Sequence, residues 1–331
     1  MSIVNPDNKK MILSCDGGGV RGLIAARCLE KLEGIEGKPC NQIFQLMAGT
    51  STGAIIVACL SIGIPAKEIA DLYLSKSKQM FMDNPNLWTK LFMWKYIKKG
   101  VKEIFRERFK DIVLKELPVD ILITAKDTVR SETMFFEKKM FGNMLLREAV
   151  ESSMSAPTYF KPNGRYVDGG VGSFNNPCYQ AAVEAIVYLN YPKGQIRLLS
   201  FGTARGVNNM KEGEAERKNK LGWAIYAVDE GMEDANEQQV RLVKREYANR
   251  REIEFRRYQI LFNQEVFNKL GIPIESLVPN IFKTDGVEHI EKLDLIGRKF
   301  ADYITFKETD GVELGEMPKL EESQFKKYLR P

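Results

Sequence analysis

Strand, tight turn and helix follow one another twice within the first 62 residues of this sequence. Residues 11–15 form a short apolar run that ends at Asp16 and three glycines, and a helical pattern then runs to Gly34. Residues 43–48 form a second apolar run, which a Gly/Ser/Thr turn joins to a hydrophobic helical stretch over residues 54–62. Because this unit is the building block of parallel sheets covered by helices, it argues against an all-helical or all-β fold.

The alternation of strands and helices continues to about residue 202. Apolar runs predict strands at residues 119–125, 133–137, 165–167 and 196–202, and helical patterns predict helices at residues 144–154 and 177–189. We therefore expect an α/β fold with three layers, α/β/α, around a central and mostly parallel sheet.

The pattern changes after residue 203. The last third holds a charged loop at residues 211–220 and a strand-like run at residues 252–261. Two amphipathic helical patterns lie at residues 236–247 and 287–303. We expect a core of residues 1–205 and a helical or mixed C-terminal extension of residues 206–331 packed on that core.

The composition excludes some kinds of site. The 331 residues are 44% hydrophobic and 28% charged, as in a globular protein with a sizeable core. His289 is the single histidine, so a His-rich metal cluster cannot be built, and we expect neither a metal nor a cofactor. The five cysteines contain no C-x-x-C pair, and we expect them to be reduced and buried.

Neither a signal peptide nor a membrane-spanning segment is recognisable. The longest apolar run, residues 53–64, has 12 residues, whereas a spanning helix needs about 20. We expect a cytoplasmic protein whose membrane contact is peripheral, at the inner face.

The first glycine-rich turn, Asp16-Gly17-Gly18-Gly19-Val20-Arg21-Gly22, fits the G-x-G-x-x-G pattern of dinucleotide-binding folds. That interpretation also needs an acidic residue about 20 positions further on, and residues 42–50 contain none. A Walker loop is excluded as well, because no Gly-Lys-Ser/Thr follows. What remains is a row of glycine amides at a helix N-terminus, which can bind an oxyanion.

The second turn, Gly49-Thr50-Ser51-Thr52-Gly53, is a G-x-S-x-G sequence between a buried strand and a hydrophobic helix. In that context the sequence predicts a nucleophile elbow, in which a tight turn exposes the serine hydroxyl. The alternative is an ordinary strand-to-helix turn whose serine caps the helix.

The third turn, Asp168-Gly169-Gly170, follows the strand expected at residues 165–167 and taken alone is a common β-turn sequence.

A serine nucleophile needs a proton acceptor, and the sequence offers two. One arrangement is a Ser51–Asp168–His289 triad, and the other is a dyad in which Asp168 takes the Ser51 proton directly. His289 lies in an amphipathic helical pattern between two glutamates, which favours the dyad. A carboxylate is a weaker base than imidazole, so a dyad depends on a strong oxyanion site, which the first turn can supply.

The three turns, in this order, resemble those of the patatin-like phospholipases, which also resemble the catalytic domain of cytosolic phospholipase A2. Residues 152–160 (SSMSAPTYF) and 198–203 (LLSFGT) are similar to that family's stretch before Asp-Gly-Gly and to its closing core strand. The resemblance covers about residues 10–205 and implies a patatin-like fold and metal-free hydrolysis of lipid acyl esters. It implies the following roles: nucleophile, Ser51; base, Asp168; oxyanion site, Gly17, Gly18, Gly19 and Arg21.

The resemblance further implies membrane phospholipids as substrates, in the manner of a phospholipase A or lysophospholipase. We expect no nucleic acid partner, because the surplus positive charge lies in one stretch, residues 90–110. Some bacterial patatin-like enzymes that this sequence resembles are antiviral effectors switched on by a cyclic nucleotide, but stand-alone lipases fit equally well. A binding or regulatory protein with a patatin fold and little lipase activity is the alternative, and a homo-oligomer stays open.

Residues 87–110 combine aromatic and basic side chains. Residues 90–110 hold eight Lys or Arg and two Glu, a local charge of +6. The rest of the chain sums to −1, so the chain's net charge of +5 comes from this one stretch. Apolar residues recur there at helical spacing, which suits the headgroup region of an anionic membrane. The alternative is a helix packed on the core with a solvated basic face. The membrane-contact candidates are Trp88, Trp94, Lys95, Lys98, Lys99 and Lys102.

Overall fold

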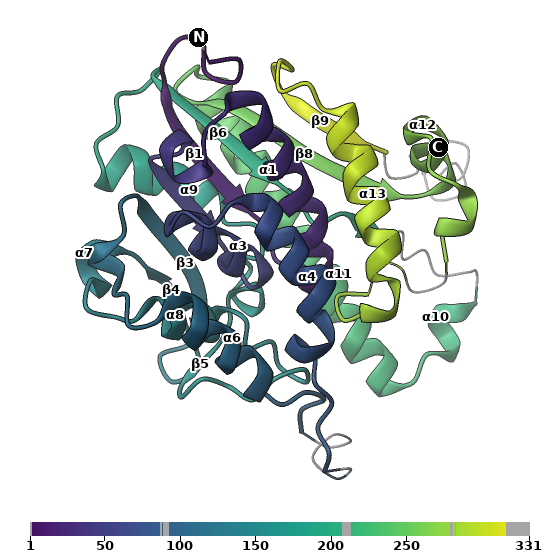
Figure 1. The fold of residues 1–331 in the computed structure, drawn as a ribbon. Coiled ribbons are helices and arrows are strands. Elements are labelled where there is room, and N and C mark those ends of the chain that lie inside the picture. Colours follow the sequence, from purple (N-terminus) through teal and green to yellow (C-terminus); the bar gives the residue numbers. More distant parts are fainter. Residues whose placement is uncertain are drawn as a thin grey trace, which may run out of the picture.

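The strands of the computed structural model form one sheet (Figure 1). The structure describes residues 2–86, 88, 93–206, 213–278, 281 and 283–315. The strand order is β4-β3-β2-β1-β6-β8-β7, with β5 paired to β3 and β9 paired to β8. The strands are β1 (Lys10–Cys15), β2 (Leu46–Gly49), β3 (Asp120–Asp127), β4 (Glu132–Phe136), β5 (Tyr166–Asp168), β6 (Ile196–Phe201), β7 (Arg205–Gly206), β8 (Glu254–Phe262) and β9 (Gly311–Leu314).

Most neighbouring strands run parallel. β1 lies between β2 and β6 and is parallel to both, and the pairs from β2 to β3 and from β6 to β8 are also parallel. β4 and β5 run antiparallel, both against β3. Parallel neighbours need long crossover connections, which helices supply here.

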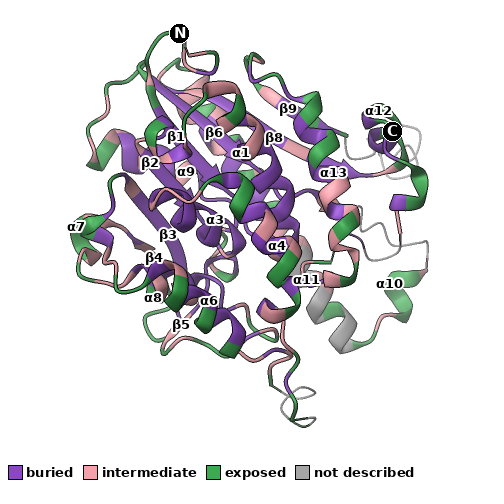
Figure 2. Ribbon diagram, in the orientation of Figure 1, coloured by how far each residue is buried: buried purple, intermediate pink, exposed green. Residues whose placement is uncertain are grey.

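Two cores lie on opposite faces of the sheet. On β1, Met11, Leu13 and Cys15 face one core and Ile12 faces the other, as the alternation of side chains along a strand requires. Helices α1 (Gly22–Glu36), α3 (Thr52–Ser61), α4 (Ala66–Met80) and α13 (Ile290–Tyr303) cover the first face, and α9 (Cys178–Val183) and α11 (Lys220–Val243) cover the second. Figure 2 shows the buried strands between these helices. The predicted three-layer α/β/α fold is confirmed.

The helices are α1 (Gly22–Glu36), α2 (Cys40–Ile43), α3 (Thr52–Ser61), α4 (Ala66–Met80), α6 (Lys99–Phe109), α7 (Lys138–Phe141), α8 (Leu146–Ser153), α9 (Cys178–Val183), α10 (Glu214–Arg217), α11 (Lys220–Val243), α12 (Gln264–Leu270) and α13 (Ile290–Tyr303). Single turns η1 (Gly19–Arg21), η3 (Gly169–Gly172) and η7 (Val287–His289) precede or join them. The helix predicted to stop at Gly34 continues to Glu36, because Gly34 is tolerated at an exposed position. Gly37, in the left-handed conformation, ends it and donates its amide to the Glu33 carbonyl.

The residues after 205 continue the core sheet. β8 pairs in parallel with β6, and β9 pairs with β8. α13 packs on α1 at the opposite end of the chain (Figure 1). The expected C-terminal extension therefore contributes strands to the sheet in addition to helices.

Two further predictions concern cysteines and membrane spans. All five cysteines are buried and unpaired, as predicted. In the part of the chain that is described, no helix combines the length and the apolar character that crossing a bilayer requires.

Candidate active site

Ser51 occupies a strained turn between β2 and α3. Its backbone angles are φ 54° and ψ −119°, a conformation that non-glycine residues rarely adopt. The turn is tight: a Cβ on Gly49 would lie 2.4 Å from the carbonyl oxygen of Gly53. The Ser51 amide donates a hydrogen bond to the Oγ of Ser153, with a donor–acceptor distance of 2.8 Å. This is the geometry expected of a nucleophile elbow, in place of a serine that caps the helix.

Asp168 ends β5 with its carboxyl group turned toward Ser51. Its side chain is buried, with 4% of the residue surface exposed, and accepts a hydrogen bond of 2.8 Å from the Gly170 amide. Burial raises the pKa of this carboxyl from 3.8 to about 6, against the smaller opposing effects of the Gly170 amide and the Ser51 hydroxyl. A carboxylate with such a pKa is ionised at neutral pH and is a better proton acceptor than an ordinary aspartate.

The first glycine turn lies beside Ser51. A Cβ on Gly17 would come within 3.3 Å of the Ser51 Cβ. The Gly17 amide donates to the Asn175 carbonyl at 2.9 Å, so it already has an acceptor. Within the described residues, the amides of Gly18 and Gly19 have no hydrogen-bond acceptor. These two donors are therefore available to an oxyanion at this end of the sheet.

Two groups from distant segments, and one side chain of the turn itself, hold the glycine turn. The Thr203 hydroxyl donates to the Gly17 carbonyl at 2.7 Å, and the Val20 amide donates to the Thr284 carbonyl at 2.8 Å. Arg21 is buried, and its Nε donates to the Gly18 carbonyl at 3.4 Å. The guanidinium of Arg21 therefore supports the turn from within the protein.

A buried ion pair fixes the start of the same turn. Both carboxylate oxygens of Asp16 accept from the guanidinium of Arg257 on β8, at 2.9 and 2.5 Å. Burial raises the pKa of Asp16 to about 6 even with Arg257 beside it. Sequence reasoning missed Arg257, Thr203 and Thr284, because no local pattern marks a residue that packs on a turn far away in the chain.

His289 belongs to η7, immediately before α13. Its Nε2 lies 3.7 Å from a carboxylate oxygen of Glu288. Among the described residues, its side chain makes no hydrogen bond to Ser51 or Asp168. The structure thus brings together Ser51, Asp168 and the glycine turn, without the histidine of the alternative triad.

The membrane-contact candidates fall into different environments. The apolar side of α6 is buried in the core through Val101, Ile104, Phe105 and Phe109, so it does not face a lipid surface. Lys98 is also buried, with 8% of its side chain exposed, between Ser155 and Glu151. Its place in the interior corrects the expectation that it contacts the membrane.

The other candidates are closer to solvent. Lys95 pairs with Asp285 at 2.6 Å and Lys102 with Glu151 at 3.1 Å, so other side chains of the protein already balance these charges. Trp94 is half-buried, and Lys161 lies over its ring. Trp88 is 75% exposed and Lys99 is exposed, which leaves these two as surface candidates. Residues 87 and 89–92 of the same stretch lie outside the described residues.

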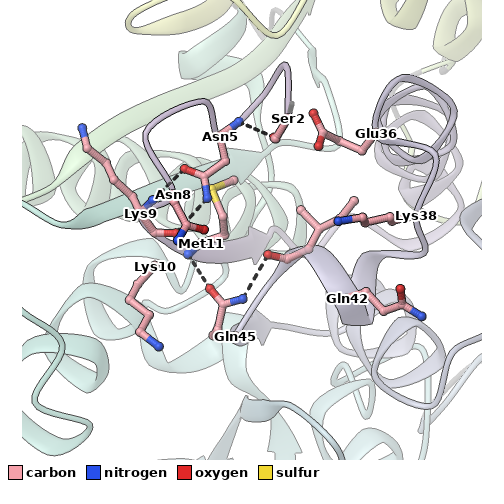
Figure 3. A pocket seen from close by; sticks show the side chains of 11 residues that line it. Ser2, Asn5, Asn8, Lys9, Lys10, Met11, Glu36, Lys38, Gln42 and Gln45 are labelled. Carbon is pink, nitrogen blue, oxygen red and sulfur yellow. Dashed lines mark hydrogen bonds between the residues drawn. The ribbon is translucent and has the colours of Figure 1, made fainter.

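A hollow of about 300 Å³ lies elsewhere, at the amino-terminal end of β1 (Figure 3). Lys9, Lys10, Lys38 and Gln42 are among its lining residues. Ser51 and the glycine turn lie beyond the opposite, carboxyl-terminal end of β1 and β2. The hollow is therefore separate from the candidate active site, which sits where ligands bind in open α/β sheets.

The sequence is similar to several known proteins. The chain is 28% identical over 207 residues to a cGAMP-activated phospholipase of Pseudomonas aeruginosa, covering 58% of this chain and 62% of that protein. It is 28% identical over 236 residues to patatin-17 of Solanum cardiophyllum, covering 58% and 60%. It is 28% identical over 198 residues to the 85/88 kDa calcium-independent phospholipase A2 of Rattus norvegicus, covering 54% and 24%. The matched region is thus less than two thirds of each of these relatives.

A family model described as patatin-like phospholipase matches residues 13–182, just over half of the 331 residues. The matched segment contains all three glycine-rich turns, with Ser51 and Asp168. On this match, the protein belongs to the patatin-like phospholipase family.

Proposed function

We propose that this protein is a serine acyl hydrolase that cleaves fatty-acyl esters of membrane phospholipids, with Ser51 as nucleophile and Asp168 as base. One observation carries the proposal: Ser51, in a strained turn, faces a buried carboxylate and lies beside two glycine amides that have no acceptor among the described residues. The phospholipase names of the relatives support the choice of a lipid ester as substrate.

The proposed reaction proceeds in two halves. Asp168 accepts the hydroxyl proton as the Ser51 Oγ attacks the ester carbonyl carbon, and the Gly18 and Gly19 amides bind the resulting oxyanion. Collapse breaks the ester bond, and Asp168 gives the proton to the departing alcohol, the lysophospholipid. Water, deprotonated by Asp168, then attacks the acyl-serine, and the fatty acid leaves as Ser51 regains its proton.

The proposed base predicts the pH dependence of the rate. Only ionised Asp168 can accept the proton, and its pKa is about 6. The turnover number should therefore fall about tenfold for each pH unit below 6 and level off above about pH 7. Turnover of a soluble ester between pH 4.5 and 8.5 measures this profile. Turnover that stays constant from pH 8.5 down to about pH 5 would contradict a base with a raised pKa.

Gly19→Ala tests the oxyanion donors. Gly19 has φ 59°, and an added Cβ would lie 1.8 Å from the Thr284 carbonyl oxygen, so the turn must move. Misplacing one oxyanion donor should lower turnover by about 100-fold or more, with little change in substrate affinity. Gly37→Ala is a suitable control, because Gly37 has a similar φ of 63° but no atom within 4 Å. Equal losses in the two variants would contradict the donor role.

Regulation by a cyclic nucleotide is a second part of the proposal. It is supported by the similarity to a cGAMP-activated phospholipase and would suit an antiviral effector. We further propose peripheral contact with the membrane through the surface that bears Trp88 and Lys99.

The decisive experiment measures free fatty acid released from anionic phospholipid vesicles, with and without a panel of cyclic nucleotides that includes cGAMP. Release by the wild type but not by Ser51→Ala supports the hydrolase. Release that depends on one nucleotide supports the effector, whereas nucleotide-independent release supports a stand-alone lipase. Nucleotide binding without any release supports the alternative, a regulatory protein with a silent site.

A further inference from the structure

The end of α8 and the two residues after it, residues 153–155, contact both members of the proposed dyad. The Oγ of Ser153 accepts the hydrogen bond of the Ser51 amide at 2.8 Å. Two residues further on, the carbonyl of Ser155 accepts a hydrogen bond from the Asp168 amide at 3.1 Å. Both serines are fully buried. One short segment therefore contacts the backbone of the nucleophile and that of the base.

The contact to Ser51 matters because of the conformation of that residue. A non-glycine residue at φ 54° and ψ −119° is strained and persists only where its surroundings fix it. The Ser51 amide precedes α3, so no turn of that helix provides it with an acceptor. The Ser153 hydroxyl is the acceptor instead, and it holds the amide in the direction that the strained turn requires.

Lys98 anchors the other end of the segment. Its Nζ donates to the Ser155 Oγ at 2.6 Å and lies 3.3 Å from Glu151 on α8. The Ser155 hydroxyl in turn donates to the Glu151 carbonyl at 2.5 Å. The position of Ser155, and with it the carbonyl that binds the Asp168 amide, is thereby fixed from both sides.

Burial of Lys98 is unfavourable for the fold itself. Desolvation lowers the pKa of Lys98 to about 8, although the nearby Glu151 carboxylate acts in the opposite direction. Glu151 also has a second partner, Lys102, whose side chain is 46% exposed. Glu151 therefore does not need Lys98 as a counter-ion, which leaves the bond to Ser155 as the distinctive contact of this lysine.

We propose that Ser153 and Lys98 are positioning residues that set the geometry between Ser51 and Asp168. Ser153 acts through the amide of the nucleophile, and Lys98 acts through Ser155 and the amide of the base. This inference rests on the proposed function of the dyad. It assigns a role to a buried lysine that the helical pattern of the sequence had placed at a membrane surface.

Two pairs of variants test the proposal on a soluble, monomeric ester, so that membrane binding does not enter. In the first pair, Ser153→Ala should lower kcat by about 10- to 100-fold and leave KM within about threefold. Ser152→Ala is the matched control, because the buried Ser152 hydroxyl donates to the Glu148 carbonyl, accepts from the Asn163 side chain and, within the described structure, makes no hydrogen bond to the dyad. Its kcat should stay within about twofold of the wild type.

In the second pair, Lys98→Met should lower kcat by about tenfold while the midpoint of urea unfolding stays the same or rises, because a desolvated charge is removed. Lys102→Met removes the other partner of Glu151 and should leave kcat unchanged. A residue with only a structural role would lose stability and activity together, and this pair separates the two.

Hydrogen exchange of the Ser51 amide gives a readout that does not depend on catalysis. The amide should exchange faster in Ser153→Ala than in the wild type or in Ser152→Ala. An active wild type with unchanged kcat in Ser153→Ala and Lys98→Met would overturn this inference alone. Activity that persists in Ser51→Ala would instead overturn the proposed function, and the positioning role with it.

Discussion

Ser51→Ala is expected to lower the release of fatty acid from phospholipid vesicles by at least about 10⁴-fold. Without the hydroxyl no acyl-enzyme can form, and only the oxyanion amides and substrate binding would still accelerate attack by water. The measurement is the initial rate of fatty-acid release under the conditions that activate the wild type. An acyl-enzyme trapped with a slow ester and seen by mass spectrometry on wild type, but absent from the variant, would identify Ser51 directly.

Asp168→Asn is the matched variant on the base, since an amide of the same shape can still accept from the Gly170 amide. We expect a loss of about 10³- to 10⁴-fold in turnover, because asparagine cannot take the Ser51 proton. A smaller loss in this variant than in Ser51→Ala is consistent with the dyad. Full activity of Asp168→Asn would contradict the dyad and would mean that another group accepts the Ser51 proton.

The same variant makes a prediction about stability. The folded-state pKa of Asp168 is raised from 3.8 to about 6, so the folded protein binds its proton more tightly than the unfolded chain does. Protonation of Asp168 therefore stabilises the folded protein at low pH, and this stabilisation is lost as the pH rises through about 4 to 6. At neutral pH the free energy of unfolding is lower by up to about 3 kcal/mol as a result. Asp168→Asn should therefore unfold at a higher urea concentration than the wild type at pH 7.5, which would also show that its inactivity is not caused by misfolding.

The elements of the site that lie in tight turns could be predicted from the sequence, because their signals are local. The glycines around Ser51 and the Asp-Gly-Gly after β5 are signatures that depend on backbone geometry within a few residues. The fold class followed in the same way from alternating apolar and helical stretches. The groups that support the glycine turn lie far from it in the sequence: Arg257, Thr203 and Thr284. No periodicity in the sequence indicates such contacts.

Helix α6 could not be placed from the sequence pattern alone. Its apolar spacing was compatible with a lipid-facing helix or with a helix packed on the core, since both need one apolar face. In the structure the apolar face packs on the core, and Lys98 turns inward to Ser155. The sequence carries the amphipathic pattern but not the identity of the element that covers it. For the same reason, a strand was expected at residues 252–261 without its place beside β6.

The largest effect on folding is expected from Gly53→Ala. Gly53 lies in the first turn of α3, where the helix crosses the end of β1. A Cβ there would lie 2.1 Å from the Cys15 carbonyl oxygen, at the end of β1, and 2.8 Å from the carbonyl oxygen of Asp16, the next residue, and both are backbone atoms. Neither can rotate away, so the helix must move off the strand.

We expect Gly53→Ala to lower the free energy of unfolding by at least about 3 kcal/mol, since it combines overpacking with strain in the core. Gly34→Ala is the control: Gly34 is also within a helix but has nothing within 4 Å, and the change should stabilise the protein by up to about 1 kcal/mol. Urea unfolding of both variants measures the difference. Any Gly53→Ala protein that still folds should hydrolyse esters poorly. Ser51 immediately precedes α3, and β1 leads into the glycine turn. Moving α3 away from β1 therefore moves the nucleophile away from the oxyanion donors. A stable and fully active Gly53→Ala variant would mean that the close contact between α3 and β1 is not what places Ser51 beside Gly18 and Gly19.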